Sequence, residues 1–258
     1  MKAYHQFYSR CVAAAVLWLM AVRPSGQAQT TIVGWDMNGV SEDVNMLGAA
    51  TFATGIGATA PSGVLSRGAG AALPGLTASN AFGASGFSSA SLSTALAGND
   101  YFSFSFAVDT GYSVTLSSIT LKMFATTNGP TNAALFSSVG GFASTDVAIQ
   151  LWPLTGNANN DQTITLSSSA FANLTGTTEF RLYAYGSGTA STDKLRFRNL
   201  TGNDLTLTGT VSAVPEPSVY ASLTGAAAFA ATLVFRSRRP RRPAAQKSPL
   251  SRIHADGM

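Results

Sequence analysis

The sequence predicts an all-β protein: a jelly-roll-like β-sandwich with an N-terminal signal peptide and one C-terminal transmembrane helix. Three observations predict this. Apolar and polar residues alternate along many short segments, as they do in strands with one buried face. Turn signals built from Gly, Asn and Asp separate these segments, and helical periodicity is nearly absent. An apolar run lies near each end of the 258 residues, outside the alternating part.

The first 28 residues have the layout of a secretory signal peptide. Basic residues Lys2 and Arg10 precede the apolar run Cys11–Val22, and a cut after Ala28 would have small residues at −3 and −1. We therefore expect export through the Sec translocon and removal of residues 1–28 by signal peptidase. A lipid-modified Cys11 is a minor alternative, because this cysteine stands at the start of the run. The mature chain then has no cysteine, so core packing alone must hold it together.

Residues 29–213 are expected to form the β-sandwich. Thr31–Asp36 is predicted to be a short strand. Residues 44–99 contain one charged residue, Arg67, among Gly, Ala, Ser and Thr. Apolar residues recur through this stretch, so we interpret it as loops and irregular strands packed on the core, with a flexible linker as the alternative.

Alternation becomes clear from Tyr101 onward. Phe102, Phe104, Phe106 and Val108 share one face of a predicted strand. Further strands are expected at Tyr112–Leu116 and Ile119–Ala125, and around Val147/Ile149/Leu151, Ile164/Leu166, Phe180/Leu182/Ala184, Leu195/Phe197 and Leu205/Leu207/Val211. Ser168–Leu174 is the one helical candidate, a single turn. At least seven short strands indicate a sandwich, and the length favours a jelly roll over the smaller immunoglobulin type.

Charge and residue types exclude several functions. Ten of the 16 basic residues lie in residues 1–28 or after Phe235, and residues 29–214 carry a net charge of −4, so nucleic-acid binding is not expected. His5, His254 and Cys11 all lie outside residues 29–213. The domain therefore has no catalytic His or Cys and none of the usual zinc or haem ligands, and we expect neither an enzyme nor a cofactor.

Carboxylates leave two weaker hypotheses open. A glycosidase needs an acid and a base, and Glu42 and Glu179 are the only Glu residues in residues 29–214. A calcium site needs oxygen ligands on loops, for which Asp100, Asp161 and Asp193 are candidates. The competing interpretation of these Asp residues is ordinary turn chemistry.

Aromatic residues suggest a carbohydrate-binding surface. If Phe180, Leu182 and Ala184 face the core, Tyr183 and Tyr185 face outward, and Trp152 is expected to lie opposite Leu151 in the same way. Their rings could stack on sugars of an extracellular polysaccharide. The alternative is that such outward rings pack under loops.

The chain after the domain has three parts. Val214-Pro215-Glu216-Pro217-Ser218 is expected to be extended. Val219–Phe235 is uncharged and 17 residues long, the lower limit for a transmembrane helix. A membrane-stop cluster of Arg236, Arg238, Arg239, Arg241 and Arg242 follows, which would place the polar extension 243–258 in the cytoplasm. A stiff linker before a tail anchor is the alternative.

In this order, the three parts resemble the PEP-CTERM sorting signal of Gram-negative bacteria, over about residues 213–242. The resemblance implies that residues 214–242 are recognised by an exosortase, a membrane-embedded cysteine transpeptidase. Cleavage near Pro215-Glu216-Pro217 would release the body to the cell surface or the extracellular matrix. The same pattern is also named the ice-binding protein C-terminal domain, a name that describes the tail and not an activity. Family members usually end close to the Arg cluster, whereas this chain continues to Met258.

The body resembles, more loosely, the jelly-roll passengers that are often joined to such tails. The similarity rests on Ile32–Gly39, Asp100–Phe106, Gly111–Leu116, Phe180–Gly186 and Leu195–Gly202. Together these observations favour a non-enzymatic exported protein that is structural or adhesive in an exopolysaccharide or biofilm matrix. A carbohydrate-binding or carbohydrate-active module and an uncleaved tail-anchored surface protein are the alternatives.

Overall fold

The computed structural model of the chain describes residues 28–59, 62–75, 77–214, 225 and 229. The predicted signal peptide up to Gln27, the Pro215–Ser218 motif, the Arg cluster and the polar extension lie outside the described residues. The predicted membrane span does too, except for Gly225 and Phe229. No helix within the described part is long and apolar enough to cross a membrane.

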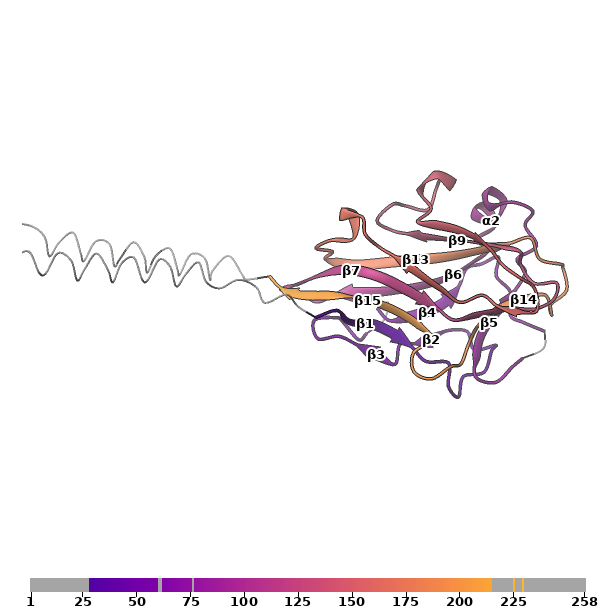
Figure 1. The fold of residues 1–258 in the computed structure, drawn as a ribbon, viewed down its shortest axis with the longest axis horizontal. Coiled ribbons are helices and arrows are strands. Elements are labelled where there is room, and N and C mark those ends of the chain that lie inside the picture. Colours follow the sequence, from indigo (N-terminus) through magenta and orange to yellow (C-terminus); the bar gives the residue numbers. More distant parts are fainter. Residues whose placement is uncertain (1–27, 60–61, 76, 215–224, 226–228, 230–258) are drawn as a thin grey trace, which may run out of the picture. The chain divides into compact units, whose positions relative to one another are not determined.

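The described domain consists of antiparallel strands in three sheets (Figure 1). The first sheet has the order β12-β7-β15-β1-β3, the second β10-β9-β13-β6-β4-β2 and the third β11-β8-β14-β5. The strands are β1 (Thr30–Trp35), β2 (Leu47–Gly48), β3 (Thr51–Phe52), β4 (Val64–Arg67), β5 (Ala81–Ser85), β6 (Tyr101–Val108), β7 (Tyr112–Leu121), β8 (Met123–Ala125), β9 (Asn132–Ser137), β10 (Gln150–Pro153), β11 (Ala158–Asn159), β12 (Gln162–Thr165), β13 (Gly176–Tyr185), β14 (Lys194–Arg198) and β15 (Leu205–Ala213). The predicted all-β class is confirmed.

The second sheet packs on the other two through aromatic side chains. On β6 the predicted alternation is confirmed, since Phe102, Phe104 and Phe106 are all fully buried. The Phe104 ring meets Trp35 of the first sheet with ring centroids 5.9 Å apart, and Phe102 meets Phe197 of the third sheet at 5.2 Å. Only Lys122 separates β7 from β8, so the first and third sheets follow one chain path and form one layer of a sandwich.

The last strand, β15, lies between β1 and β7 and joins the beginning of the domain to its middle. Strand β7 was expected to be interrupted, with one strand at Tyr112–Leu116 and another at Ile119–Ala125. This prediction is wrong. Ser117 and Ser118 stay within β7, and both hydroxyls contact that of Thr208 on β15. A register shift between Thr208 and Gly209 accommodates the extra residue of β7. Position 209 requires glycine, because a Cβ there would collide with the Thr115 carbonyl oxygen.

A short helix, α2 (Leu92–Gly98), lies in the stretch that was expected to hold only loops and irregular strands. Its N-terminus has a reciprocal capping box, in which the Ser91 hydroxyl accepts from the Thr94 N–H and the Thr94 hydroxyl accepts from the Ser91 N–H. Leu92 and Ala95 are buried on the outer face of the second sheet. The helix therefore covers that face.

Other elements differ from expectation in detail. Strand β9 was not predicted, because four successive apolar residues, Ala133–Phe136, are buried on both faces and show no alternation. The strand expected around Val147, Ile149 and Leu151 begins only at Gln150, after the 3₁₀ turn η1 (Thr145–Val147). The one-turn candidate Ser168–Leu174 contains the 3₁₀ turn η2 (Ser169–Phe171).

Candidate functional site

The aromatic residues expected on the surface are mostly buried. Trp152 is 7% exposed and belongs to the main core, whereas its neighbour Leu151 is 54% exposed, so the expected facing of this strand is wrong. Tyr183 does point away from the main core, but α2 and neighbouring side chains cover it and leave it 1% exposed. Tyr185 is half-buried beside the same cluster. Exposed stacking by Trp152 and Tyr183 is therefore excluded.

An arginine stands between two rings on this outer face. The Arg181 guanidinium carbon lies 4.5 Å from the centre of the Tyr101 ring and 4.0 Å from that of Phe142. Its Nε donates to Glu179 Oε1 at 2.8 Å, and the Ser103 hydroxyl donates to the same oxygen at 2.8 Å. We call Tyr101, Ser103, Phe142, Glu179 and Arg181 the arginine cluster.

Sheet register brings most of this cluster together. Glu179, Arg181 and Tyr183 share one face of β13, and Arg181 pairs with Ser103 while Tyr183 pairs with Tyr101 on β6. The i, i+2 spacing of Glu179 and Arg181 was available in the sequence as a same-face ion pair. Phe142 comes from a loop, for which no periodic signal existed.

The electrostatics of the arginine cluster follow from partial burial. Desolvation lowers the pKa of Arg181, but its bonds to Glu179 and Tyr183 outweigh this, and the pKa is raised. Burial raises the pKa of Tyr183, although Arg181 opposes this shift. Both charged side chains of the cluster stay about a quarter exposed, at 23% for Arg181 and 29% for Glu179. The cluster therefore offers solvent a fixed, charged hydrogen-bonding edge beside aromatic rings.

A shallow hollow of about 470 Å³ lies beside this cluster. Its lining is Ser93, Leu96 and Ala97 of α2 with Phe142, Ala143, Ser144 and Thr145. Hydroxyl groups, small side chains and one aromatic ring line it together. Such a lining suits a ligand with both apolar and hydroxyl faces.

The three calcium candidates do not form a group. Asp100 accepts from the Ser89 hydroxyl at 2.5 Å, and Asp193 accepts from the Ala190 N–H at 3.0 Å. Asp161 pairs with Arg198. The described residues contain no cluster of three or more His, Cys, Asp or Glu that could hold a metal ion. Asp100, Asp161 and Asp193 thus serve local structure here.

The two glutamates considered for hydrolysis have separate structural partners. Glu42 is fully buried, and its Oε2 accepts from Lys194 Nζ at 2.6 Å and from the Ala78 N–H at 2.7 Å. Glu179 belongs to the arginine cluster. A side chain as buried as Glu42 cannot reach a polysaccharide, so this pair offers no acid and base for glycoside cleavage.

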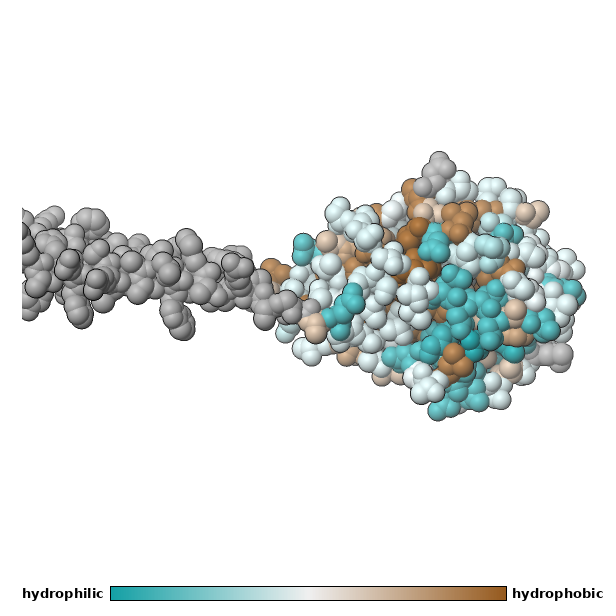
Figure 2. All heavy atoms as spheres, viewed as in Figure 1, coloured by the Kyte–Doolittle hydropathy of each residue, from teal (hydrophilic) through white to brown (hydrophobic). Residues whose placement is uncertain are grey.

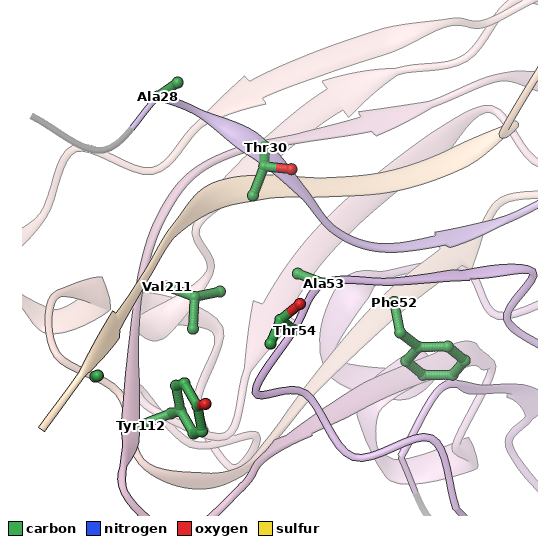
Figure 3. Close-up of a pocket in the computed structure, with 8 residues that line it drawn as sticks. Ala28, Thr30, Phe52, Ala53, Thr54, Tyr112 and Val211 are labelled. Atoms are coloured by element: carbon green, nitrogen blue, oxygen red, sulfur yellow. The ribbon is translucent and has the colours of Figure 1, made fainter.

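The domain ends where the expected sorting motif begins. Strand β15 runs to Ala213, and the Val214 N–H still donates to the Gly111 carbonyl at 2.8 Å. Residue 215 is proline, which has no N–H and cannot extend the ladder. A hollow of about 520 Å³ lies at this end (Figure 3), lined by Ala28, Thr30, Phe52, Ala53, Thr54, Tyr112, Val211 and Ala213.

Comparisons with known proteins identify no family for this chain. No family model matches the chain, and no curated protein matches it. One similar solved structure is the carbohydrate-binding module CBM36 in complex with calcium and xylotriose, at 14% identity and a TM-score of 0.26, covering 72% of this chain and 99% of that one. Another is the xylan-binding module CBM15, at 12% identity and a TM-score of 0.32, covering 74% and 100%. TM-scores this low carry no argument about a shared fold or ligand.

Proposed function

We propose that this protein is a non-enzymatic exported β-sandwich, sorted to the cell surface or extracellular matrix by cleavage near Pro215-Glu216-Pro217. The observation that supports this most directly is the end of the fold. The last ladder bond is made by Val214, which is also the first residue of the expected motif. A processing enzyme needs an extended substrate segment outside a sheet, and proline at position 215 has no N–H with which to continue the ladder.

The remaining parts of the proposal come from the sequence. A signal peptide is removed after Ala28, the helix Val219–Phe235 holds the precursor in the inner membrane, and the Arg cluster keeps the tail in the cytoplasm. An exosortase-like transpeptidase then releases a jelly-roll-like passenger. Its role in the matrix is structural or adhesive, because the domain lacks His and Cys and its buried glutamate is committed to Lys194.

The C-terminus of the mature protein tests this proposal. In the native host we expect mass spectrometry to find it near Pro215-Glu216-Pro217, with no peptide from Val219 onward. Glu216→Ala is expected to leave the precursor uncut, while Asp43→Ala, which removes an exposed acid elsewhere in the domain, is processed as wild type. An intact wild-type chain ending at Met258 in the membrane fraction would contradict sorting and leave a tail-anchored surface protein.

A second candidate function is carbohydrate binding at the arginine cluster. The observation that favours it is the hollow beside Phe142, next to the exposed edges of Arg181 and Glu179. One ring face and several hydroxyl and charged groups are what a sugar ring needs for stacking and hydrogen bonding.

Calorimetry of the mature protein with matrix polysaccharide from the host tests this function. We expect Phe142→Ala to weaken binding by about tenfold, because the stacking surface is lost. Leu200→Ala removes an exposed apolar side chain elsewhere and serves as the matched control. Equal binding by the Phe142 variant and wild type would exclude this site.

A further inference from the structure

Both ends of the described domain lie at one end of the sandwich. Thr30 at the start of β1 pairs with Gly209 on β15, and the strands are antiparallel. Residues before Thr30 therefore run beside the residues that follow Gly209. Thr30 and Val211 line the same hollow, between β1, β15 and the loop that carries Thr54 (Figure 3).

The shape of the hollow is fixed by contacts between its lining residues. Its floor includes the Tyr112 ring, which lies so close to Gly55 that a Cβ there would stand 2.6 Å from two ring carbons. Gly55 also has a φ of +85°, a conformation that other residues rarely adopt. The loop and the ring thus fix each other's position.

This end is almost free of charge. It is built by residues 29–31, 52–57, 106–116, 165–177 and 209–214, and among these described residues Asp109 carries the one charged side chain. Strongly hydrophilic residues gather elsewhere on the face in Figure 2, near β5 and β14 in the matching view of Figure 1. We call the surface formed by the hollow and its rim the exit end.

The segment that would join the domain to the expected membrane span, which we call the tether, is short. Four residues, Pro215–Ser218, separate the last ladder bond from the expected membrane span at Val219. Fully extended, they reach about 14 Å at most. An enzyme that holds this segment must therefore work within that distance of the folded domain.

We infer that the exit end docks on the membrane-embedded enzyme that processes the motif. The inference rests on the proposed sorting function. A concave surface with one charged side chain, an exposed Thr rim and an aromatic floor loses little hydration free energy when it meets protein. The described residues of the exit end offer no Lys or Arg to attract anionic lipid headgroups, so the bilayer itself is the less suitable partner.

Charge substitutions in the full-length precursor test this docking. Thr54 is exposed and lines the hollow. We expect Thr54→Asp and Thr54→Arg each to slow processing about tenfold in a pulse–chase experiment, because either charge must be desolvated in the contact. Thr30→Asp, on the β1 side of the hollow, should behave in the same way. Thr189→Arg, at an exposed position away from the exit end, should process within about twofold of wild type.

A longer tether provides the decisive comparison. Inserting a flexible Gly/Ser linker of about eight residues between Val214 and Pro215 should bring both Thr54 variants back to within about twofold of wild type, since the domain can then stand away from the enzyme. Wild-type rates for both unextended Thr54 variants would overturn the inference. Slow processing of Thr54→Asp alone would indicate a lipid surface instead. A wild-type precursor that is never cut would refute the sorting function itself.

Discussion

Replacing Glu42 with alanine is expected to lower the free energy of unfolding by about 3–5 kcal/mol. The carboxylate is fully buried and accepts two hydrogen bonds through Oε2, from Lys194 Nζ and from the Ala78 N–H. Its other oxygen, Oε1, lies 4.0 Å from Arg196 Nη1. One carboxylate thus interacts with several buried or half-buried donors and joins the Glu42 loop to the third sheet.

The size of this effect comes from what the substitution leaves behind. Lys194 is only 6% exposed, and its ammonium group would lose the carboxylate to which it donates at 2.6 Å. The Ala78 N–H would lose its acceptor. Burial already lowers the pKa of Arg67 to about 10, and the negative charge of Glu42 works against that shift. Removing Glu42 therefore also disfavours the charged form of Arg67.

Urea unfolding of the mature protein measures the effect. Asp43→Ala, next to Glu42 but exposed, is the matched control and is expected to change stability by less than about 0.5 kcal/mol. The double variant Glu42→Leu/Lys194→Met should recover much of the loss, because it removes both charges together. A loss below about 1 kcal/mol for Glu42→Ala would show that the pair is not what holds the loop.

Replacing Phe102 with alanine is expected to cost about 3–5 kcal/mol. The ring is fully buried and meets three others, with centroid distances of 5.9 Å to Phe82, 5.5 Å to Phe87 and 5.2 Å to Phe197. Phe82 and Phe197 belong to the third sheet, whereas Phe102 belongs to the second. The substitution would open a cavity at the junction of the two layers, which a β-sheet backbone cannot close by collapsing.

Thermal or urea unfolding provides the measurement, with Leu151→Ala as its control. Leu151 is a large apolar residue at 54% exposure, so its removal should change stability by less than about 0.5 kcal/mol. Comparable losses in the free energy of unfolding for the two variants would mean that the aromatic contacts do not stabilise the core. The control also reports on β10, where sequence reasoning placed Leu151 inside and Trp152 outside.

Sequence alternation predicted the strands that have one face on the core and the other near solvent. β6, β14 and β15 are of this kind, and so is β13 over residues 176–181. It did not predict β9, because α2 covers the outer face there and both faces became apolar. Helix α2 itself was hidden in a stretch of small residues, where its capping box, Ser91 to Thr94, was the one local signal.

The candidate site was predicted less well than the fold. The period of two correctly placed Tyr183 on the face away from the main core, but it carries no information on what covers that face. Trp152 was misplaced because its strand begins after a 3₁₀ turn, which reverses the register expected from Val147 and Ile149. The contact of Phe142 with Arg181 joins a loop to a strand far away in sequence, and no local pattern encodes such a contact.

The position of β15 determines when the first sheet can be completed during synthesis. This strand pairs with β1 on one side and β7 on the other, yet its residues are the last of the domain to be synthesised. Until they emerge, one edge of each neighbour stays open to unwanted strand pairing. The first sheet can therefore be completed only after residue 213 has been synthesised.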